Sequence, residues 1–227
     1  MRTIVKICGL STEETLDAAI AAGADMVGLN FYPKSPRFVT PERAAVLAAR
    51  ARGKLAVVAL TVDVPLPALG DLVAAVDPDW LQLHGTEDED TIRAARRTFG
   101  RPVMRAVGVS ATGDLAAAAR FAAVADRVLL DAKPPKGPGA LPGGNGIAFD
   151  WDLLAGLEAG PYMLSGGLSV GNVAAALAAA PVIGVDVSSG VERAPGVKDP
   201  DLIHAFVSAV RAVGPIAARS QLESIAP

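Results

Sequence analysis

Hydrophobic and polar positions divide the 227-residue chain into two alternating kinds of segment. Short β-branched or leucine-rich runs predict strands, and the longer alanine-rich amphipathic segments between them predict helices. The predicted strands are Thr3–Cys8, Met26–Asn30, Leu55–Val62, Trp80–His84, Val103–Gly108, Arg127–Asp131, Tyr162–Ser165 and Ile183–Val187. The predicted helices are Thr12–Ala22, Pro41–Arg52, Leu66–Ala75, Glu87–Phe99, Thr112–Val124, Trp151–Leu157, Val170–Ala179 and Asp199–Val213. Capping residues before Pro or Glu support several helix starts, as at Thr40-Pro41-Glu42, Thr86-Glu87 and Asp199-Pro200.

Strand–helix units that repeat in this way predict parallel strands joined by right-handed crossovers. A closed (β/α)8 TIM barrel uses eight such units in roughly 250 residues. A doubly wound sheet is the alternative, but it would normally need fewer strands and a glycine-rich first turn. The first turn here, Cys8-Gly9-Leu10-Ser11, lacks that pattern. We therefore expect a single (β/α)8 barrel domain over residues 1–227, with a weakly patterned tail from about residue 214.

Composition narrows the functional classes. The net charge is −3 and no Lys/Arg block occurs, so the electrostatic signature of a nucleic-acid binder is missing. No apolar run approaches the roughly 20 residues of a membrane-spanning helix, and the N-terminus lacks a signal-peptide pattern. One cysteine and two histidines provide neither an internal disulfide nor a zinc-type cluster. We expect a cytoplasmic protein without a metal, a cofactor, a nucleic-acid partner or a membrane partner, and either a monomer or a homodimer.

Alternation along the strands predicts which side chains share a face. One face of each strand is apolar, and the other carries polar groups near the C-terminal end of the strand: Lys6 and Cys8, Gln82 and His84, Asp131, and Asp186 and Ser188. Barrel enzymes keep their chemistry at that end. Cys8 and Asp131 are three strands apart, so we expect them to face each other across the mouth as a base and an acid. The alternatives are a buried, inert Cys8 and an Asp131 that only caps its loop.

Two glycine-containing loops follow the last two predicted strands, Ser165-Gly166-Gly167-Leu168-Ser169 and Ser188-Ser189-Gly190-Val191-Glu192. Glycines allow backbone N–H groups to approach an anion, and helix N-termini favour negative charge. Barrels often bind phosphate at these two loops. We therefore predict a phosphate site formed by Gly166, Gly167, Ser188, Ser189 and Gly190.

Other polar residues allow two interpretations. Arg37 follows the second strand and could hold a carboxylate in bidentate fashion, or it could be a solvated surface arginine. His84 could relay a proton or bind substrate, or it could simply be a satisfied polar residue. Lys6 and Arg105 are expected to point inward as structural charges paired with a group such as Asp186. The long segment Ala132–Ala148, rich in Gly, Pro and Lys, predicts a lid or a disordered loop.

Several of these motifs occur together and in order along the chain. They are Val5-Lys6-Ile7-Cys8-Gly9, Ser35-Pro36-Arg37, Leu81-Gln82-Leu83-His84-Gly85, Leu129-Leu130-Asp131, Gly143-Gly144-Asn145-Gly146, Phe149-Asp150-Trp151, Ser165-Gly166-Gly167-Leu168, Gly184-Val185-Asp186-Val187-Ser188-Ser189-Gly190-Val191-Glu192 and Pro195-Gly196-Val197-Lys198-Asp199. In this combination the chain resembles the phosphoribosylanthranilate isomerase family, the barrel enzymes of tryptophan biosynthesis. The family more often has threonine at the position of Asn145 and an aromatic residue in the third strand.

The resemblance implies an isomerase that carries out the Amadori rearrangement of N-(5-phosphoribosyl)anthranilate to 1-(o-carboxyphenylamino)-1-deoxyribulose 5-phosphate. It assigns Cys8 as general base and Asp131 as general acid. It also implies that Arg37 holds the anthranilate carboxylate and that the two glycine loops hold the phosphate. The implied partner is thus a small-molecule phosphosugar.

Two other phosphosugar barrels are alternatives. An indole-glycerol-phosphate synthase would need catalytic lysine and glutamate residues and an N-terminal extension, and a pentose-phosphate epimerase would need paired His and Asp metal ligands. A non-enzymatic scaffold would be expected to have lost the acid or the base, and both are present here.

Overall fold

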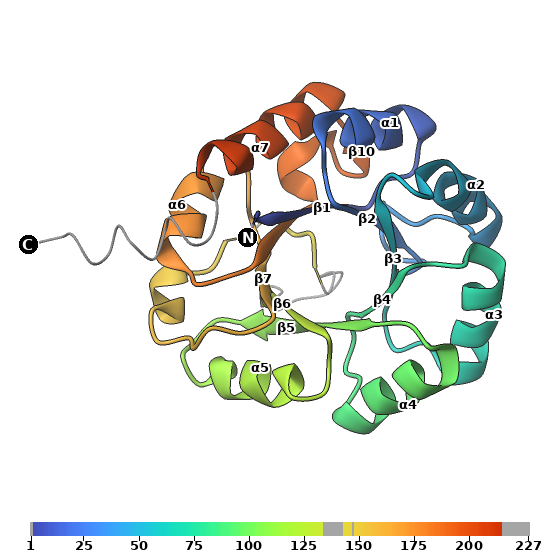
Figure 1. Ribbon diagram of the computed structural model, residues 1–227, viewed down its shortest axis with the longest axis horizontal. Helices are drawn as coiled ribbons and strands as arrows, with labels where there is room; N and C mark the ends of the chain where they lie inside the picture. Colours follow the sequence, from blue (N-terminus) through green and yellow to red (C-terminus); the bar gives the residue numbers. More distant parts are fainter. Residues whose placement is uncertain (1, 134–142, 147, 215–227) are drawn as a thin grey trace, which may run out of the picture.

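Eight parallel strands follow one another around a closed barrel in the order of the chain, which confirms the predicted fold (Figure 1). The computed structural model describes residues 2–133, 143–146 and 148–214. The strands are β1 Ile4–Cys8, β2 Met26–Asn30, β3 Ala56–Thr61, β4 Trp80–Leu83, β5 Val103–Val109, β6 Arg127–Ala132, β7 Tyr162–Leu164 and β8 Gly184–Val187. The predicted tail beyond residue 214 and most of the predicted loop after β6 lie outside the described residues.

Helices surround the barrel on its outer side (Figure 1). They are α1 Glu13–Ala22, α2 Pro41–Ala51, α3 Leu66–Val76, α4 Glu89–Phe99, α5 Asp114–Ala122, α6 Val173–Ala179 and α7 Pro200–Ala212. The side chains of Thr40 and Asp199 accept hydrogen bonds from the first turns of α2 and α7, as their sequence signals predict. None of the helices in the described ranges is long and apolar enough to cross a membrane.

Several predicted helices differ from the structure: α5 is two residues shorter than predicted at each end, α6 begins at Val173 rather than Val170, and two further segments differ more instructively. The segment predicted as a helix over Trp151–Leu157 forms only the short 3-10 helix η1, Trp151–Leu154. Gly156 and the following Gly160-Pro161 disfavour its continuation, because glycine and proline are the poorest helix formers. Helix α4 begins at Glu89 after the cap Asp88, two residues later than predicted. The side chain of Glu87 instead accepts hydrogen bonds from the backbone N–H groups of Asp63 and Gly85.

Short elements that the sequence pattern did not predict follow β8. They are the 3-10 helix η2 Ser189–Val191 and the two antiparallel strands β9 Glu192–Ala194 and β10 Val197–Lys198. This hairpin returns the chain toward the mouth of the barrel before α7 begins. It carries two buried charged residues that become important in the site.

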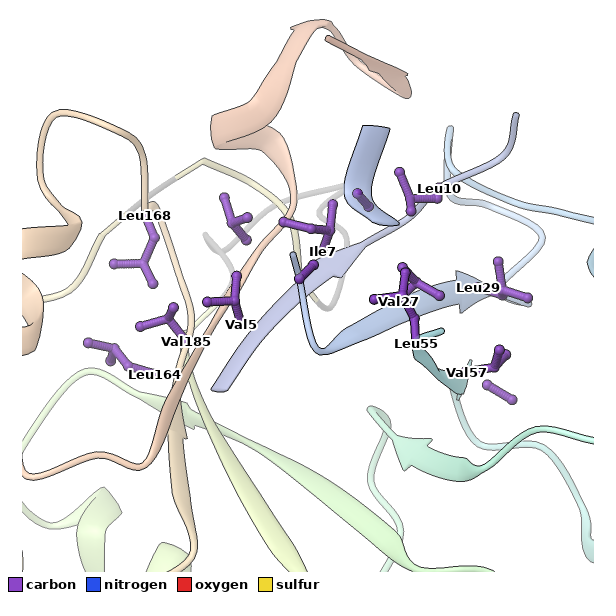
Figure 2. Packing of buried hydrophobic residues seen from close by; sticks show 14 of the residues in the cluster. Val5, Ile7, Leu10, Val27, Leu29, Leu55, Val57, Leu164, Leu168 and Val185 are labelled. Atoms are coloured by element: carbon purple, nitrogen blue, oxygen red, sulfur yellow. The ribbon is translucent and has the colours of Figure 1, made fainter. Parts of the chain in front are cut away.

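Apolar side chains on the outer faces of the strands pack under the helices (Figure 2). The cluster includes Val5, Ile7, Val27, Leu29, Val57 and Val185. Each fully buried side chain of this size stabilises the fold by about 1.5–3 kcal/mol relative to an exposed one. This apolar layer fixes the register of each strand, because a shift of one residue would turn the apolar side chains into the barrel.

A second apolar cluster fills the lower half of the barrel interior. It consists of Met26, Val58, Met104, Ala106, Leu129 and Met163. Below it, the guanidinium of Arg127 stacks over the Trp80 ring at 4.4 Å from the centroid. The interior is therefore a packed floor, and a ligand has room only above it, at the C-terminal ends of the strands.

The barrel closes where the two ends of the described chain meet. Strand β1 pairs with β8, with Lys6 opposite Asp186. Arg211 in α7 donates hydrogen bonds to the carbonyl oxygens of Thr3 and Gly23. These contacts fasten the last helix to the first strand–helix unit.

Candidate active site

A cavity of about 610 Å³ opens at the C-terminal ends of the strands. Predicted site residues that line it are Cys8, Arg37, His84, Asp131, Gly166, Gly167, Ser188 and Ser189. Gly190 does not line it. The structure thus brings residues from both halves of the barrel to one place.

Cys8 is the last residue of β1 and is only 5% exposed. It pairs in register with Gly28 of β2. A Cβ atom on Gly28 would lie 2.8 Å from the Cys8 sulfur and 3.1 Å from the Lys6 Nζ, so glycine leaves the room that these two groups occupy. Burial raises the pKa of the Cys8 thiol, while the nearby ammonium groups of Lys6 and Lys198 lower it.

Lys6 lies fully buried beneath Cys8, two residues earlier on the same face of β1. Its Nζ donates a 2.8 Å hydrogen bond to Asp186 Oδ1. Burial works against the charged form, but the Asp186 carboxylate raises the pKa of Lys6, so the ammonium stays charged. The predicted pairing of Lys6 with Asp186 is therefore present, and it puts a fixed positive charge next to the thiol.

Asp131, in β6, belongs to a chain of buried polar groups. Its Oδ1 accepts a 2.9 Å hydrogen bond from the backbone N–H of Ala132, and its Oδ2 lies 3.3 Å from His84 Nε2. Gln82, fully buried below His84, donates from Nε2 to His84 Nδ1 at 2.9 Å. With Nδ1 as acceptor, the proton of a neutral His84 is on Nε2 and points at Asp131.

Gly143 covers the pair of Asp131 and His84. A Cβ atom at this position would lie 2.7 Å from Asp131 Oδ2 and 2.7 Å from His84 Nε2. The loop after β6 therefore approaches the acid so closely that only glycine fits. The residues of this loop on either side of 143–146 are largely outside the described residues.

Arg37 is buried, with 5% exposure, which excludes its interpretation as a solvated surface residue. Its Nε donates to Glu192 Oε1 at 2.7 Å, and its Nη2 donates to Glu192 Oε2 at 2.8 Å. The bidentate edge of the guanidinium is thus already taken by Glu192. Glu192 also accepts from Lys198 Nζ at 2.7 Å. Sequence reasoning singled out neither Glu192 nor Lys198 as a site residue.

The loops after β7 and β8 lie against each other. Gly166 and Gly167 both have left-handed backbone conformations, at φ +83° and +61°, where glycine is favoured. The N–H groups of Gly167 and Leu168 have no acceptor among the described residues. A Cβ on Gly190 would stand 1.8 Å from the Leu168 carbonyl oxygen, so Gly190 contributes by letting the two loops touch. Unpaired N–H groups in such a turn suit an anion.

Arg105 corrects one expectation, because it points outward rather than into the barrel. Its neighbours Met104 and Ala106 belong to the interior cluster, while its guanidinium donates to the carbonyl oxygens of Leu83 and Gly85. It also lies 5.0 Å from the Phe121 ring centroid. Arg105 pairs with Glu87 at 3.4 Å and takes no part in the cavity.

No group of three or more His, Cys, Asp or Glu side chains in the described parts of the chain is arranged to hold a metal ion. The cavity thus presents the Cys8 thiol near the Lys6 ammonium, the Asp131 carboxyl group next to His84, and Arg37 held by Glu192. It also presents a turn whose N–H groups at 167 and 168 have no acceptor within the described parts of the chain. A thiol and a carboxyl group that line one cavity are groups of the kind that can transfer protons to and from a bound ligand.

Comparison with known proteins gives one consistent result. The family model described as N-(5'phosphoribosyl)anthranilate (PRA) isomerase matches residues 5–209. The chain is 55% identical over 213 residues to an N-(5'-phosphoribosyl)anthranilate isomerase of Rhodopseudomonas palustris (strain HaA2), covering 93% of this chain and 97% of the relative. It is 54% identical over 222 residues to one of Azorhizobium caulinodans, with 97% of each chain covered.

Solved structures are similar as well. Phosphoribosyl anthranilate isomerase from Thermotoga maritima superposes with a TM-score of 0.82 at 33% identity, over 92% of this chain and 99% of that one. A phosphoribosyl anthranilate isomerase in complex with reduced 1-(o-carboxyphenylamino)-1-deoxyribulose 5-phosphate superposes with a TM-score of 0.80 at 32% identity, again over 92% and 99%.

Proposed function

Because this chain belongs to the N-(5'-phosphoribosyl)anthranilate isomerase family, we propose that Cys8 and Asp131 are the base and the acid with which it isomerises N-(5'-phosphoribosyl)anthranilate in tryptophan biosynthesis. One observation supports these roles above all. Cys8 and Asp131, which are distant in sequence, line the same cavity, and each is buried. The alternatives of an inert core cysteine and a loop-capping aspartate give no reason for the two to share a cavity.

The charges of the substrate fit the two ends of the cavity. A phosphate would accept hydrogen bonds from the N–H groups of the turn at Gly167 and Leu168, beside Ser189 of the next loop. The carboxylate of the aromatic ring would lie toward Arg37. A phosphosugar analogue of the product is bound in a related isomerase, which agrees with this class of ligand. The ribose would then lie between Cys8 and Asp131.

The reaction needs two proton movements on the ribose. Asp131 donates a proton to the furanose ring oxygen as the C1–O bond breaks, leaving a Schiff base between C1 and the aromatic nitrogen. The Cys8 thiolate then removes the proton from C2, which gives an enolamine. The enolamine tautomerises to the 1-deoxyribulose product. His84, at 3.3 Å from Asp131 Oδ2, orients the acid.

The surroundings of Cys8 and of Asp131 support the two proton transfers. Lys6 favours the thiolate form of Cys8, which is the form that can act as a base. Burial of Asp131 excludes water from the acid, so its proton is delivered to the substrate. General acid and base groups placed in this way each contribute about 10²–10⁴-fold in rate.

The cellular location, the oligomeric state and the domain organisation of the protein are predicted only in general terms. A related isomerase of Thermotoga maritima is described as dimeric. For this chain, a monomer or a homodimer in the cytoplasm, organised as one domain, stays a prediction.

Variants of the two central residues test the roles. Cys8→Ala and Asp131→Asn should each lower kcat by about 10²–10⁴-fold, because each removes one proton-transfer group. Turnover is followed by the loss of substrate fluorescence, and the affinity for inorganic phosphate should stay unchanged because neither side chain belongs to the phosphate loops. Near-normal kcat in either variant would remove that residue from the mechanism. Rescue of a tryptophan auxotroph that lacks this isomerase tests the activity itself.

A further inference from the structure

Three charged side chains form a buried network beside the cavity. Arg37, Glu192 and Lys198 have side chains that are at most 6% exposed. Glu192 Oε1 accepts from both Arg37 Nε and Lys198 Nζ, each at 2.7 Å. Its Oε2 accepts from Arg37 Nη2 at 2.8 Å and from the Gly196 N–H at 3.2 Å. Both carboxylate oxygens are therefore fully used within the protein.

The pairing of Arg37 with Glu192, here called the clamp, determines which nitrogen of Arg37 can reach a ligand. Nε and Nη2 point at Glu192, and Nη2 also donates to the Gly144 carbonyl oxygen at 3.2 Å. Nη1 has no acceptor among the described residues, and it lies 2.6 Å from where a Cβ on Gly144 would stand. Arg37 and Gly144 both line the cavity. Nη1 is thus the nitrogen left for an anion.

Charge counting points in the same direction. The network contains one carboxylate for two basic side chains, Arg37 and Lys198, all largely shielded from water; burial lowers the pKa of Lys198, and Glu192 acts against that change. Burial alone would favour the neutral acid, but Arg37 and Lys198 lower the pKa of Glu192, so its carboxylate is ionised at neutral pH. An uncompensated buried positive charge is unfavourable unless a counter-ion arrives. A ligand carboxylate at Nη1 would supply it.

The same network reaches the phosphate loop. Lys198 Nζ donates to the Ser188 carbonyl oxygen at 2.9 Å, and the Ser188 hydroxyl donates to the Cys8 carbonyl oxygen at 3.2 Å. Glu192 therefore fixes the guanidinium relative to the strand end that carries the base.

We propose that Glu192 is a positioning residue that determines specificity: it holds Arg37 so that Nη1 alone meets the carboxylate of the substrate's aromatic amine, and it thereby makes the site selective for a carboxylate-bearing amine. This inference rests on the proposed function. It also modifies the expected contact, because a carboxylate would be held end-on at Nη1 rather than across the bidentate edge.

The test compares two ligands that differ only in the carboxylate. One is reduced 1-(o-carboxyphenylamino)-1-deoxyribulose 5-phosphate, and the other is the same reduced compound made from aniline. Calorimetry gives the Kd of each for the wild type, Glu192→Gln, Arg37→Met and the double variant. Glu87→Gln is the matched control, since Glu87 is also a buried glutamate paired with an arginine, Arg105, but lies outside the cavity.

Glu192→Gln should raise the Kd of the carboxylated ligand by about 10–100-fold, which corresponds to the loss of a hydrogen bond to a charged group. It should raise the Kd of the aniline ligand by less than about twofold. KM for the substrate should rise with little change in kcat. In the Arg37→Met background the further Glu192→Gln change should add nothing, because the two residues act as one unit. Glu87→Gln should leave the ratio of the two affinities unchanged, whatever it does to thermal stability.

Equal weakening of both ligands by Glu192→Gln, or independent effects of the Arg37 and Glu192 changes, would overturn the proposal. If Glu192→Gln fails to fold, Glu192→Asp is used instead, because it keeps the negative charge but has a side chain one carbon shorter. It should lower the selectivity for the carboxylated ligand in the same direction but by a smaller factor. Turnover by the wild type is measured in parallel. An inactive wild type would refute the proposed function, whereas an active wild type with an unselective clamp would refute only the role of Glu192.

Discussion

Replacing Lys6 by methionine removes the positive charge beneath the Cys8 thiol. The Cys8 sulfur and the Lys6 Nζ lie 2.8 and 3.1 Å from a common point over Gly28, so they are no more than about 6 Å apart. At an effective dielectric constant of about 20, opposite unit charges 4–6 Å apart attract by about 3–4 kcal/mol. Asp186, on the other side of the ammonium, offsets part of this. We therefore expect a loss of about 10–100-fold in kcat/KM near neutral pH.

The sign of the pH effect follows from the thiol. Burial is the largest influence and raises the pKa of Cys8 above its ordinary value, and Lys6 is the strongest influence that lowers it. In the proposed role of Cys8 only the thiolate can accept a proton, so kcat/KM is expected to rise with pH through this pKa. Without Lys6 the pKa rises further, and the ascending limb of the profile moves to higher pH.

The chain has one cysteine, so the ultraviolet absorbance of the thiolate reports on Cys8 alone. Titration of the wild type and of Lys6→Met gives the two thiol pKa values directly. Because Lys6→Met leaves Asp186 buried without its partner, Lys6→Met combined with Asp186→Asn serves as the charge-balanced form. Coincident titration curves for the wild type and both variants would refute the view that Lys6 stabilises the thiolate.

Two further predictions concern loops at the mouth of the barrel. Gly143→Ala should lower kcat by at least about tenfold with little loss of stability, because the added Cβ would push the loop away from Asp131 and shift the position of its carboxyl group. Steady-state kinetics measure the first effect and thermal unfolding measures the second. An unchanged kcat would contradict the close approach of Gly143 to Asp131. Asp114→Asn should destabilise the fold by about 1 kcal/mol at neutral pH, after allowance for solvent screening. Burial would raise the pKa of Asp114, but hydrogen bonds from Lys133, Ser110 and Ala111 lower it from 3.8 to about 2. A lowered carboxyl pKa stabilises the folded state above pH 3.8, and this stabilisation is lost as the pH falls toward 2. Urea unfolding should therefore show the full difference in the free energy of unfolding between variant and wild type at pH 7, and only a small part of it near pH 2. An equal difference at both pH values would contradict the assignment.

The strands could be predicted because two local signals agree. β-branched runs mark them, and polar residues at every second position mark the inner face, which placed Cys8 and Asp131 correctly at the cavity. The same signal is absent in β5, where Met104 and Ala106 on one face are as apolar as Val103 and Val107 on the other. Without a contrast between faces the inward assignment of Arg105 had no basis, and the structure shows it outside.

The clamp on Arg37 could not be predicted for a different reason. Arg37 and Glu192 are 155 residues apart in the chain, and no local pattern connects them. Only closure of the barrel brings the loop after β2 next to the hairpin after β8. The same holds for the approach of Gly143 to Asp131 and His84, which depends on the path of a loop and not on any periodicity.

The pairing of β1 with β8 and its contact with α7 have a consequence for the order in which the protein folds. Cys8 lies in β1, which is synthesised before the other strands of the barrel, whereas Asp186 and Lys198, which influence its pKa, lie in β8 and β10. The pairing of β8 with β1 and the docking of α7 on the first strand–helix unit bring Asp186 and Lys198 beside Cys8. Contacts between the chain ends carry the largest loop-closure entropy and form late. The proposed base therefore lies on a strand that is made before the residues that influence its charge, and it gains its charged neighbours only when the barrel closes.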